Sequence, residues 1–292
     1  MMGKNPGRTS DGLSRLLPRF SLSALLISLL SGLILVFQYQ PFGQVFADLE
    51  TMTSQAPFGF FFRRLHYFSG QVFAGLALAH TADHFWRRNY RLFGFSGWLK
   101  LWLAVCLALL LLFTGFVLKG DREGVLAGTI LKHILQEIPL LGERLGDAFV
   151  GRGDSFFYYP YLWHCWLLPL VSVWLLKEHI RAWFPRERYF GPILVLLCMV
   201  ALIFELPEAL PPETVVSEAH GPWFFLALQE LLKYWPAWLA GLGFPLALST
   251  VFLLLPLVSA AWEGSLRCLL LLVVTGYSMV TLLLWGGILL GD

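Results

Sequence analysis

The stretch LHYFSGQVFAGLALAHTADHF, residues 65–85, is apolar over most of its length and carries histidines at positions 66, 80 and 84. About 20 residues of α-helix cross a hydrocarbon core of about 30 Å, so the stretch predicts a transmembrane helix. Ionisable side chains inside such a helix are costly unless paired or ligated, which makes each a functional candidate. His66 and His80 are 14 residues apart. Four helical turns take about 14.4 residues and rise about 22 Å, so these imidazoles lie on one helix face at two depths.

A second stretch, HCWLLPLVSVWLLKEH at 164–179, repeats this arrangement with His164 and His179, which are 15 residues apart. Both helices are expected to run from the same side of the membrane, so His66 is level with His164 and His80 with His179. Neutral imidazole is a good axial ligand for haem iron. The four histidines therefore predict two b-type haems with bis-histidine ligation. His66 and His164 would hold the positive-side iron, and His80 and His179 the cytoplasmic-side iron.

Two alternatives remain for these histidines: buried residues hydrogen-bonded to neighbouring helices, or ligands of another metal. Other metal motifs, such as H-E-x-x-H, place their ligands within one or two turns, so the spacing at two depths favours haem. His84 follows His80 by one turn, and we interpret it as a structural residue at the cytoplasmic interface. Gly32 and Gly115 support the haem interpretation, because glycine lets a flat macrocycle approach the backbone.

The composition excludes a water-soluble fold. Hydrophobic residues make up 57% of the 292 residues and charged residues 14%, against roughly 45–50% and about 25% in soluble domains. The net charge of +2 offers no basic surface for nucleic acid. The four cysteines lie singly in apolar runs, without C-x-x-C or C-x-x-C-H. We expect them to be small core residues, with no c-type haem and no iron–sulfur cluster on this chain.

Seven apolar stretches are long enough to cross a membrane. We read the first as an uncleaved helix rather than a signal peptide, because its apolar run exceeds the usual signal length. The predicted fold is an all-α integral membrane protein, a seven-helix bundle with a four-helix di-haem core. The predicted spans are 20–37, 65–85, 97–118, 156–176, 189–206, 238–258 and 267–290.

Lysine and arginine favour the cytoplasmic side of a membrane. They concentrate in the N-terminal segment and in the loops after the second, fourth and sixth spans, whereas the loop after the fifth span carries four glutamates. We therefore expect a bacterial inner-membrane protein with a cytoplasmic N-terminus and a periplasmic C-terminus. Residues 124–140 and 220–235 predict helices on the membrane surface. Bundle packing and a ligand-site role both remain open for them.

These residues resemble the cytochrome b subunit of cytochrome bc and b6f quinol oxidoreductases. RRLH at 63–66 is similar to the family's R-x-x-H, GFVL at 115–118 to its G-Y-x-L, and HCWLLP at 164–169 to its H-x-x-x-L-P. The resemblance implies that Arg63 serves a haem propionate. It also implies a di-haem four-helix domain at 1–185, fused to a three-helix region at 186–292 that resembles subunit IV of the b6f type.

One departure concerns the family's P-E-W-Y motif at the quinol-oxidation site. Its counterpart here is HGPWFF at 220–225, which places Gly221 where the family has a proton-accepting glutamate. Other residues are then candidates for quinone binding and proton transfer, with salt bridging or lipid headgroup contact as the alternative for each. They are Glu218, His220 and Lys119 on the positive face, and His84, Arg87, Lys177 and Arg181 on the cytoplasmic face.

The leading hypothesis is the electron-transfer subunit of a membrane quinol oxidoreductase, with menaquinol as one candidate quinol. The chain would then act with partner subunits, such as a Rieske protein, a cytochrome c or another iron–sulfur protein, and a homodimer is compatible with it. One alternative is a haem conduit that anchors a redox enzyme without binding quinone. A transporter that relays protons through its histidines is the third hypothesis.

Overall fold

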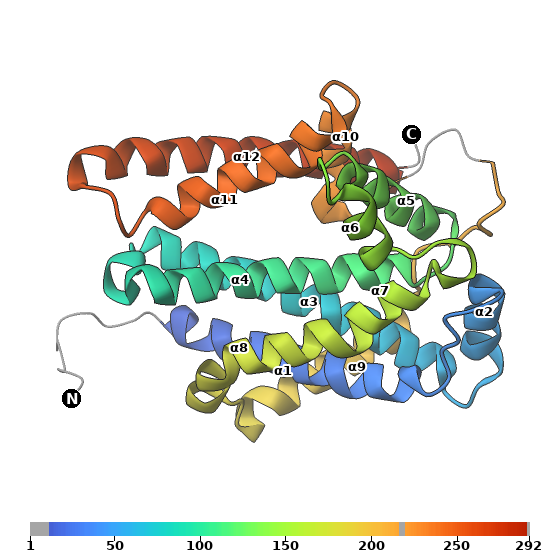
Figure 1. The fold of residues 1–292 in the computed structure, drawn as a ribbon. Coiled ribbons are helices and arrows are strands. Elements are labelled where there is room, and N and C mark those ends of the chain that lie inside the picture. Colours follow the sequence, from blue (N-terminus) through green and yellow to red (C-terminus); the bar gives the residue numbers. More distant parts are fainter. Residues whose placement is uncertain (1–11, 216–219, 291–292) are drawn as a thin grey trace.

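The computed structural model describes residues 12–215 and 220–290, and every regular element in these ranges is helical (Figure 1). Short 3-10 turns occur at Gly153–Ser155 and Trp223–Phe225, and π-helical segments at Trp163–Leu167 and Leu239–Gly243. The α-helices are α1 (Gly12–Val36), α2 (Val45–Gln55), α3 (Gly59–Trp86), α4 (Tyr90–Val117), α5 (Arg122–Gln136), α6 (Gly142–Phe149), α7 (Tyr158–Leu162), α8 (Leu168–Trp183), α9 (Glu187–Ile203), α10 (Leu226–Leu232), α11 (Phe244–Leu254) and α12 (Ala260–Leu290).

The long helices run along one direction and form an elongated bundle (Figure 1). Helix α1 packs along α3, α9 contacts both, and α4 contacts α3 and α8. The pair α11 and α12 lies against the α4 side. The short helices α2, α5, α6 and α10 gather at one end, opposite the turns that join α3 to α4, α8 to α9 and α11 to α12. The two surface helices expected from the sequence are confirmed as helices, in α5 and in the 223–232 segment.

Three apolar clusters hold the bundle together. The central one joins α1, α3 and α9 through residues such as Leu25, Phe73 and Leu197. A second one joins α3, α4, α11 and α12 at the end that carries the α3–α4 turn. The third lies at the opposite end, where Phe113 and Val117 of α4 meet Ala127 of α5 and Phe224. Van der Waals packing at both ends and in the centre keeps the helices in register, because packing rather than the hydrophobic effect holds helices together within a membrane.

A polar contact between α4 and α12 supplements the second cluster. The buried Glu263 carboxylate accepts a hydrogen bond from the Tyr90 hydroxyl and pairs with Arg91 at 2.8 Å. The Arg267 guanidinium donates to the Phe85 carbonyl at 2.8 Å. A carboxylate this close to an apolar core is tolerated because its oxygens are paired.

Within the described residues, three helices are by themselves long and apolar enough to cross a membrane. They are 14–36, 90–117 and 260–288, which correspond to the first, third and seventh predicted spans. Helix α3 has the length, but His66, Gln71 and His80 lower the mean hydropathy of its middle part, and α9 has 17 residues. An all-helical integral membrane protein is therefore confirmed, whereas the seven spans and the four-helix core stay predictions.

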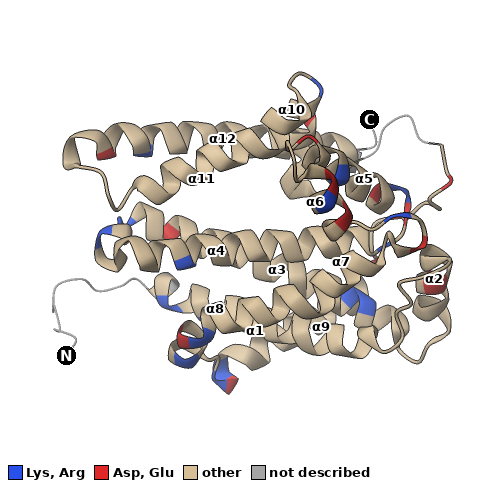
Figure 2. Ribbon diagram, in the orientation of Figure 1, with Lys and Arg blue, Asp and Glu red and all other residues tan. Residues whose placement is uncertain are grey.

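Charged residues concentrate toward the two ends of the bundle, and the central parts of the helices are almost free of them (Figure 2). This distribution fits a protein whose middle lies in hydrocarbon. The cysteines are all free; three are partly buried, whereas Cys268 on α12 is exposed. The expectation that all four are core residues is thus wrong for Cys268, because α12 turns much of its surface away from the bundle and an apolar stretch alone does not show which face is covered.

The fourth predicted span is not one regular helix. A π-helical segment, Trp163–Leu167, separates α7 from α8, and the Leu168 N–H donates to the Trp163 carbonyl. Pro169 follows directly and has no N–H to donate to the carbonyl four residues earlier, which favours this wider turn. The π segment contains His164, so the irregularity lies at a candidate ligand.

Candidate functional site

The rings of His66 and His164 face each other across the interface between α3 and the π segment. Their centroids are 5.8 Å apart and their planes are at 85°. Bonds from a metal to imidazole nitrogen are about 2 Å long. Two imidazoles on opposite sides of one ion would have ring centroids roughly 6 Å apart, so the observed separation fits a shared iron.

Hydrogen bonds fix the tautomer of both rings. The His66 Nδ1 lies 2.9 Å from the Ser28 carbonyl oxygen, and the His164 Nδ1 lies 3.0 Å from the Leu111 carbonyl oxygen. A carbonyl oxygen only accepts, so Nδ1 carries the hydrogen in each ring and Nε2 keeps its lone pair. Metal-binding histidines commonly donate their second ring nitrogen to a carbonyl in this way. Both rings are thus prepared as Nε2 ligands. The neighbouring hydroxyls of Ser31 and Thr114 lie 3.5 Å and 3.1 Å from the same nitrogens.

Two glycines make room for these rings. A Cβ at Gly32 of α1 would lie 2.8 Å from the His66 Cε1, and one at Gly115 of α4 would lie 2.7 Å from the His164 Cε1. Both distances are shorter than carbon atoms tolerate, so each position requires glycine. The two predicted glycines therefore contact the imidazoles themselves, one from each side of the pair.

The second pair, His80 and His179, has ring centroids 5.9 Å apart. Both ring nitrogens of His80 are buried without a hydrogen-bond partner in the described residues. A buried polar atom normally has a hydrogen-bond partner. The ring of His80 is therefore suited to bind a metal ion such as iron through one of its nitrogens. The His84 ring lies beside that of His80, with centroids 4.3 Å apart and planes at 56°, and its Nδ1 lies 2.8 Å from the Asn89 amide nitrogen. The role of His84 as a structural residue at the cytoplasmic interface stays a prediction; the structure places it beside the His80 ring.

In the part of the chain that the structure describes, no three His, Cys, Asp or Glu side chains converge as a metal-ion cluster. The histidines meet as two pairs. A haem iron takes only its axial ligands from the protein, so paired histidines are a sufficient donor set for it.

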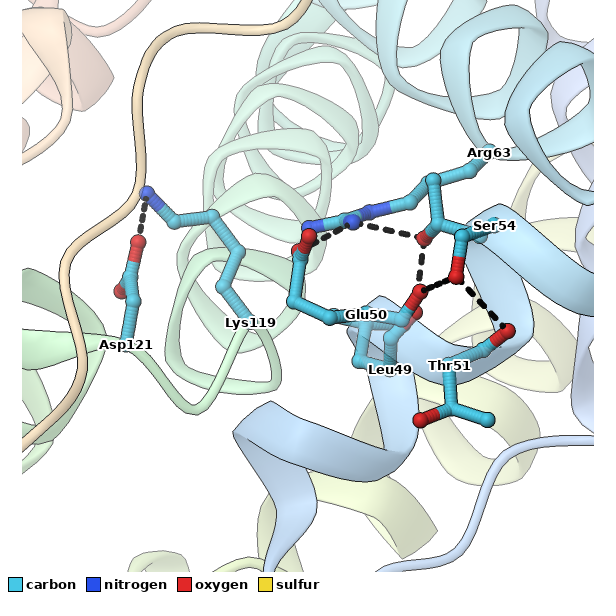
Figure 3. A network of polar contacts seen from close by, with 8 residues as sticks. Leu49, Glu50, Thr51, Ser54, Arg63, Lys119 and Asp121 are labelled. Atoms are coloured by element: carbon cyan, nitrogen blue, oxygen red, sulfur yellow. Dashed lines mark hydrogen bonds and ion pairs between the residues drawn. The ribbon is translucent and has the colours of Figure 1, made fainter.

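Arg63, which the resemblance assigns to a haem propionate, lies near the start of α3 and reaches α2. Its guanidinium pairs with Glu50 at 2.7 Å and donates to the Thr53 hydroxyl at 2.7 Å (Figure 3). Its side chain is 13% exposed and that of Glu50 48%. The sequence did not indicate Glu50, because the contact depends on how α2 folds back onto α3.

The remaining cytoplasmic candidates do not form one cluster. Arg87 pairs with Asp83 at 2.7 Å, one turn back on α3. Arg181 pairs with Glu178 at 3.0 Å, and both side chains are largely exposed. Lys177 is also exposed. Arg87 is close to the His80 pair through Asp83 and His84, whereas the two α8 residues point to the surface.

The positive-face candidates converge beyond the end of α4. Lys119 pairs with Asp121 at 2.7 Å (Figure 3) and lies 3.7 Å from Glu123. The His220 Nδ1 lies 3.9 Å from the other Glu123 oxygen. The structure thus brings Lys119 and His220 together around Glu123, a residue that sequence reasoning missed. Glu218 lies outside the described residues.

Glu123 left a weak signal in the sequence. It lies in the first turn of α5, four residues after Lys119, and the turn between α4 and α5 brings the two opposite charges to 3.7 Å. Burial raises the pKa of Glu123 above its usual value, and Lys119 opposes that rise. Asp121 beside it has a structural role, since its carboxylate caps α5 by accepting from the Gly124 N–H at 2.8 Å.

The segment that corresponds to P-E-W-Y is anchored on both sides. The Trp223 indole donates to the Gln71 side chain of α3 at 2.8 Å, and the Tyr277 hydroxyl of α12 donates to the Phe224 carbonyl at 2.6 Å. The Gly221 N–H donates to the Gln229 side-chain oxygen at 2.8 Å. This segment therefore lies over the end of the bundle that holds the His66 pair.

Comparisons with known proteins agree with this geometry. The family model described as "Cytochrome b(N-terminal)/b6/petB" matches residues 71–241, more than half of the chain. "Cytochrome b6" of Heliobacterium mobile is 25% identical over 166 residues, which cover 54% of this chain and 76% of that protein. "Cytochrome b6" of Cyanidium caldarium is 27% identical over 168 residues, with the same coverage.

A solved structure shares the fold. A chain of "Hyperthermophilic respiratory Complex III" superimposes with a TM-score of 0.68 at 17% identity, covering 92% of this chain and 83% of that one. The matched range of the family model contains His80, His164 and His179. From the paired histidines, the family model and the shared fold together, the chain belongs to the cytochrome b family of bc and b6f complexes.

Proposed function

We propose that this chain is the di-haem electron-transfer subunit of a membrane quinol oxidoreductase. Membership of the cytochrome b family implies b-type haem. The observation that carries the proposal is the pair of Nδ1-anchored imidazoles, His66 and His164, together with the second pair, His80 and His179. When bound, each haem supplies reversible one-electron transfer.

The chain's own residues then have defined parts. The Ser28 and Leu111 carbonyls hold the His66 and His164 rings in the Nε2-ligating tautomer. Gly32 and Gly115 keep space beside those rings. Arg63, now paired with Glu50, would turn its guanidinium to a propionate of the positive-side haem. His84 supports the cytoplasmic pair from one side.

The proposal includes the predicted topology. Seven spans would place the N-terminus in the cytoplasm and the C-terminus in the periplasm of a bacterial inner membrane. Residues 1–185 would form the di-haem domain and 186–292 the region similar to subunit IV. Support comes from the positions of the described chain ends at opposite ends of the bundle (Figure 1).

A cytochrome b subunit needs partners to deliver or remove electrons. The fold neighbour belongs to a respiratory Complex III, so we propose a Rieske protein, a cytochrome c or another iron–sulfur protein as the electron acceptor, and quinol, including menaquinol, as the donor. A homodimer is compatible with the exposed apolar surfaces of α9 and α12, which lipid would otherwise cover.

One observation favours a second function. Gly221 stands where the family has its proton-accepting glutamate, and its N–H is bonded to Gln229. A haem conduit that passes electrons to an attached enzyme without binding quinone would not need that glutamate. Quinone analogues separate the two functions, since they should inhibit haem reduction only in a quinol oxidoreductase.

The first test counts haem in the purified chain by the pyridine haemochrome method. The wild type should contain two b haems per chain. His66→Ala and His80→Ala should each lose one, because each removes an axial ligand from one pair. His133→Ala, an exposed histidine on α5, is the matched control and should keep both haems. Haem-free protein that is properly folded would refute the electron-transfer proposal and favour the transporter hypothesis.

A further inference from the structure

Three separate segments meet at Glu123. Lys119 comes from the turn after α4, Glu123 from the first turn of α5, and His220 from the segment before the 223–225 turn. The Lys119 ammonium lies closer to the Asp121 carboxylate, at 2.7 Å, than to the Glu123 carboxylate, at 3.7 Å. Glu123 is therefore not in close contact with the Lys119 ammonium, but its carboxylate also accepts a hydrogen bond from the His220 backbone, which favours the charged form.

The groups that face Glu123 come from every element around it. Lys119, Asp121, His220 and Tyr67 of α3 all interact with its charge. Lys119 and His220 favour the carboxylate, whereas Asp121 and burial disfavour it, and burial is the largest of these effects. A carboxyl group that binds its proton more readily than an exposed glutamate is suited to accept a proton.

An apolar, aromatic cluster adjoins Lys119. The Lys119 ammonium lies 4.2 Å from the centroid of the Phe116 ring. Phe116, Trp223 and Phe225 pack around the apolar cluster that joins α4, α5 and Phe224. Flat aromatic rings stack well on such side chains, so this cluster is suited to a quinol ring.

This cluster is tied to the helices of the positive-side histidine pair. The Trp223 indole donates to Gln71, which follows His66 on α3 by five residues. Phe116 follows Gly115, which contacts the His164 ring. A quinol on this cluster would therefore lie at the same end of the bundle as the proposed positive-side haem.

From this geometry, we propose that Glu123 replaces the missing P-E-W-Y glutamate and accepts a proton from a quinol hydroxyl, with His220 as the next proton carrier. The inference rests on the proposed quinol oxidoreductase function. The separation of 3.9 Å between His220 and Glu123 is one that a small rotation or a bridging water can close.

The proton step is balanced without any electron acceptor. The quinol O–H bond breaks, its electron pair stays on the quinol oxygen, and a new O–H bond forms on the Glu123 carboxylate. The products are a quinol anion and a neutral carboxylic acid. Transfer of the proton to the His220 imidazole restores the carboxylate for the next quinol.

The test uses membranes that contain the assembled complex, with a short-chain menaquinol and a short-chain ubiquinol as probes. Stopped-flow absorbance follows b-haem reduction as a function of pH. Glu123→Gln should slow reduction about 100-fold or more and remove the fall in rate on acidification, because a protonated Glu123 cannot accept a proton. Glu123→Asp should keep the pH dependence at an intermediate rate, and His220→Gln should slow reduction less than Glu123→Gln.

Glu143→Gln, an exposed carboxylate on α6, is the matched control and should behave as the wild type. Haem content and the dithionite-reduced spectrum verify assembly of each variant. In infrared spectra of the full chain, a carboxyl C=O band that titrates above the ordinary glutamate pKa of about 4.3 should disappear in Glu123→Gln and persist in Glu143→Gln.

The outcomes separate the two proposals. Wild-type haem that neither quinol reduces, although dithionite does, would refute the quinol oxidoreductase function itself. Wild-type reduction that Glu123→Gln leaves unchanged in rate and pH dependence would refute the role of Glu123 and leave the function standing. If Glu123→Gln does not assemble, a pH-independent rate in Glu123→Asp contradicts the role.

Discussion

The position of the His164 ring requires a residue without a side chain at position 115. A Cβ there would stand 2.7 Å from the His164 ring, inside the contact distance of two carbons. The ring cannot retreat freely, because its Nδ1 is held by the Leu111 carbonyl at 3.0 Å. Any side chain at this position must therefore displace either the imidazole or α4.

Gly115→Val should remove haem from the positive-side pair. Overpacking of this kind costs about 1–3 kcal/mol, and His164 would leave its ligating position to relieve it. We expect the haem content of the purified chain to fall from two toward one, with loss of one bis-histidine signal in electron paramagnetic resonance.

Gly75→Val is the control for this substitution, because nothing lies within 4 Å of a Cβ at Gly75 of α3. It should retain both haems. Two haems and unchanged spectra in Gly115→Val would show that His164 does not depend on this glycine.

At the scale of elements, the π segment decides where His164 points. In a regular α-helix, each residue is rotated by about 100° around the helix axis relative to the one before it. The π turn at Trp163–Leu167 contains one extra residue, so the side chains that precede it are rotated around the axis relative to those of α8. Single π turns occur often at functional sites. The wide turn compensates for the step of 15 residues between His164 and His179, which exceeds four regular turns.

Pro169→Ala should convert this segment toward a regular helix. The substitution restores a backbone N–H at position 169 that could donate to the Cys165 carbonyl, and the resulting rotation would carry His164 away from His66. We expect a loss of about one haem per chain in the pyridine haemochrome assay, with helix content by circular dichroism unchanged or higher.

Pro192→Ala tests whether any proline substitution has this effect, since Pro192 lies inside α9, a helix that carries none of the four histidines. It should keep two haems. Full haem content in Pro169→Ala would mean that packing against α4, rather than the proline, maintains the π turn.

At the scale of the whole molecule, the topology predicts which turns face which compartment. Leu140 lies in the fully exposed turn between α5 and α6, and Arg186 in the exposed turn between α8 and α9. These turns are at opposite ends of the bundle (Figure 1). In a background with the four native cysteines replaced, Leu140→Cys should react with a membrane-impermeant maleimide added to intact spheroplasts.

Arg186→Cys should react only after the membrane is permeabilised, because the proposed topology places its turn in the cytoplasm. The opposite pattern would invert the proposed orientation and place the His66 pair on the cytoplasmic side. Reaction of both cysteines in intact cells would contradict the proposed seven spans.

The membrane class, the helical fold and the four candidate ligands could be predicted from the sequence. Apolar composition and helical spacing are local properties, and they survive in any packing of the chain. The histidine pairing also followed from spacing, since two helices that run in the same direction can match their residues only in order. The number of spans could not be settled in this way, because π segments interrupt the fourth and sixth predicted spans and polar side chains lie within the second.

The contacts that tune the site were decided by the tertiary structure alone. The carbonyls that orient His66 and His164 lie 38 and 53 positions away in the chain. Arg63 meets Glu50 through the fold of α2, and Glu123 meets His220, which follows it by 97 positions. No local pattern encodes such distances, because they arise from the way buried faces pack. The sequence by itself therefore determined which groups could bind haem, and the packing of the helices determined which of their atoms are held ready to do so.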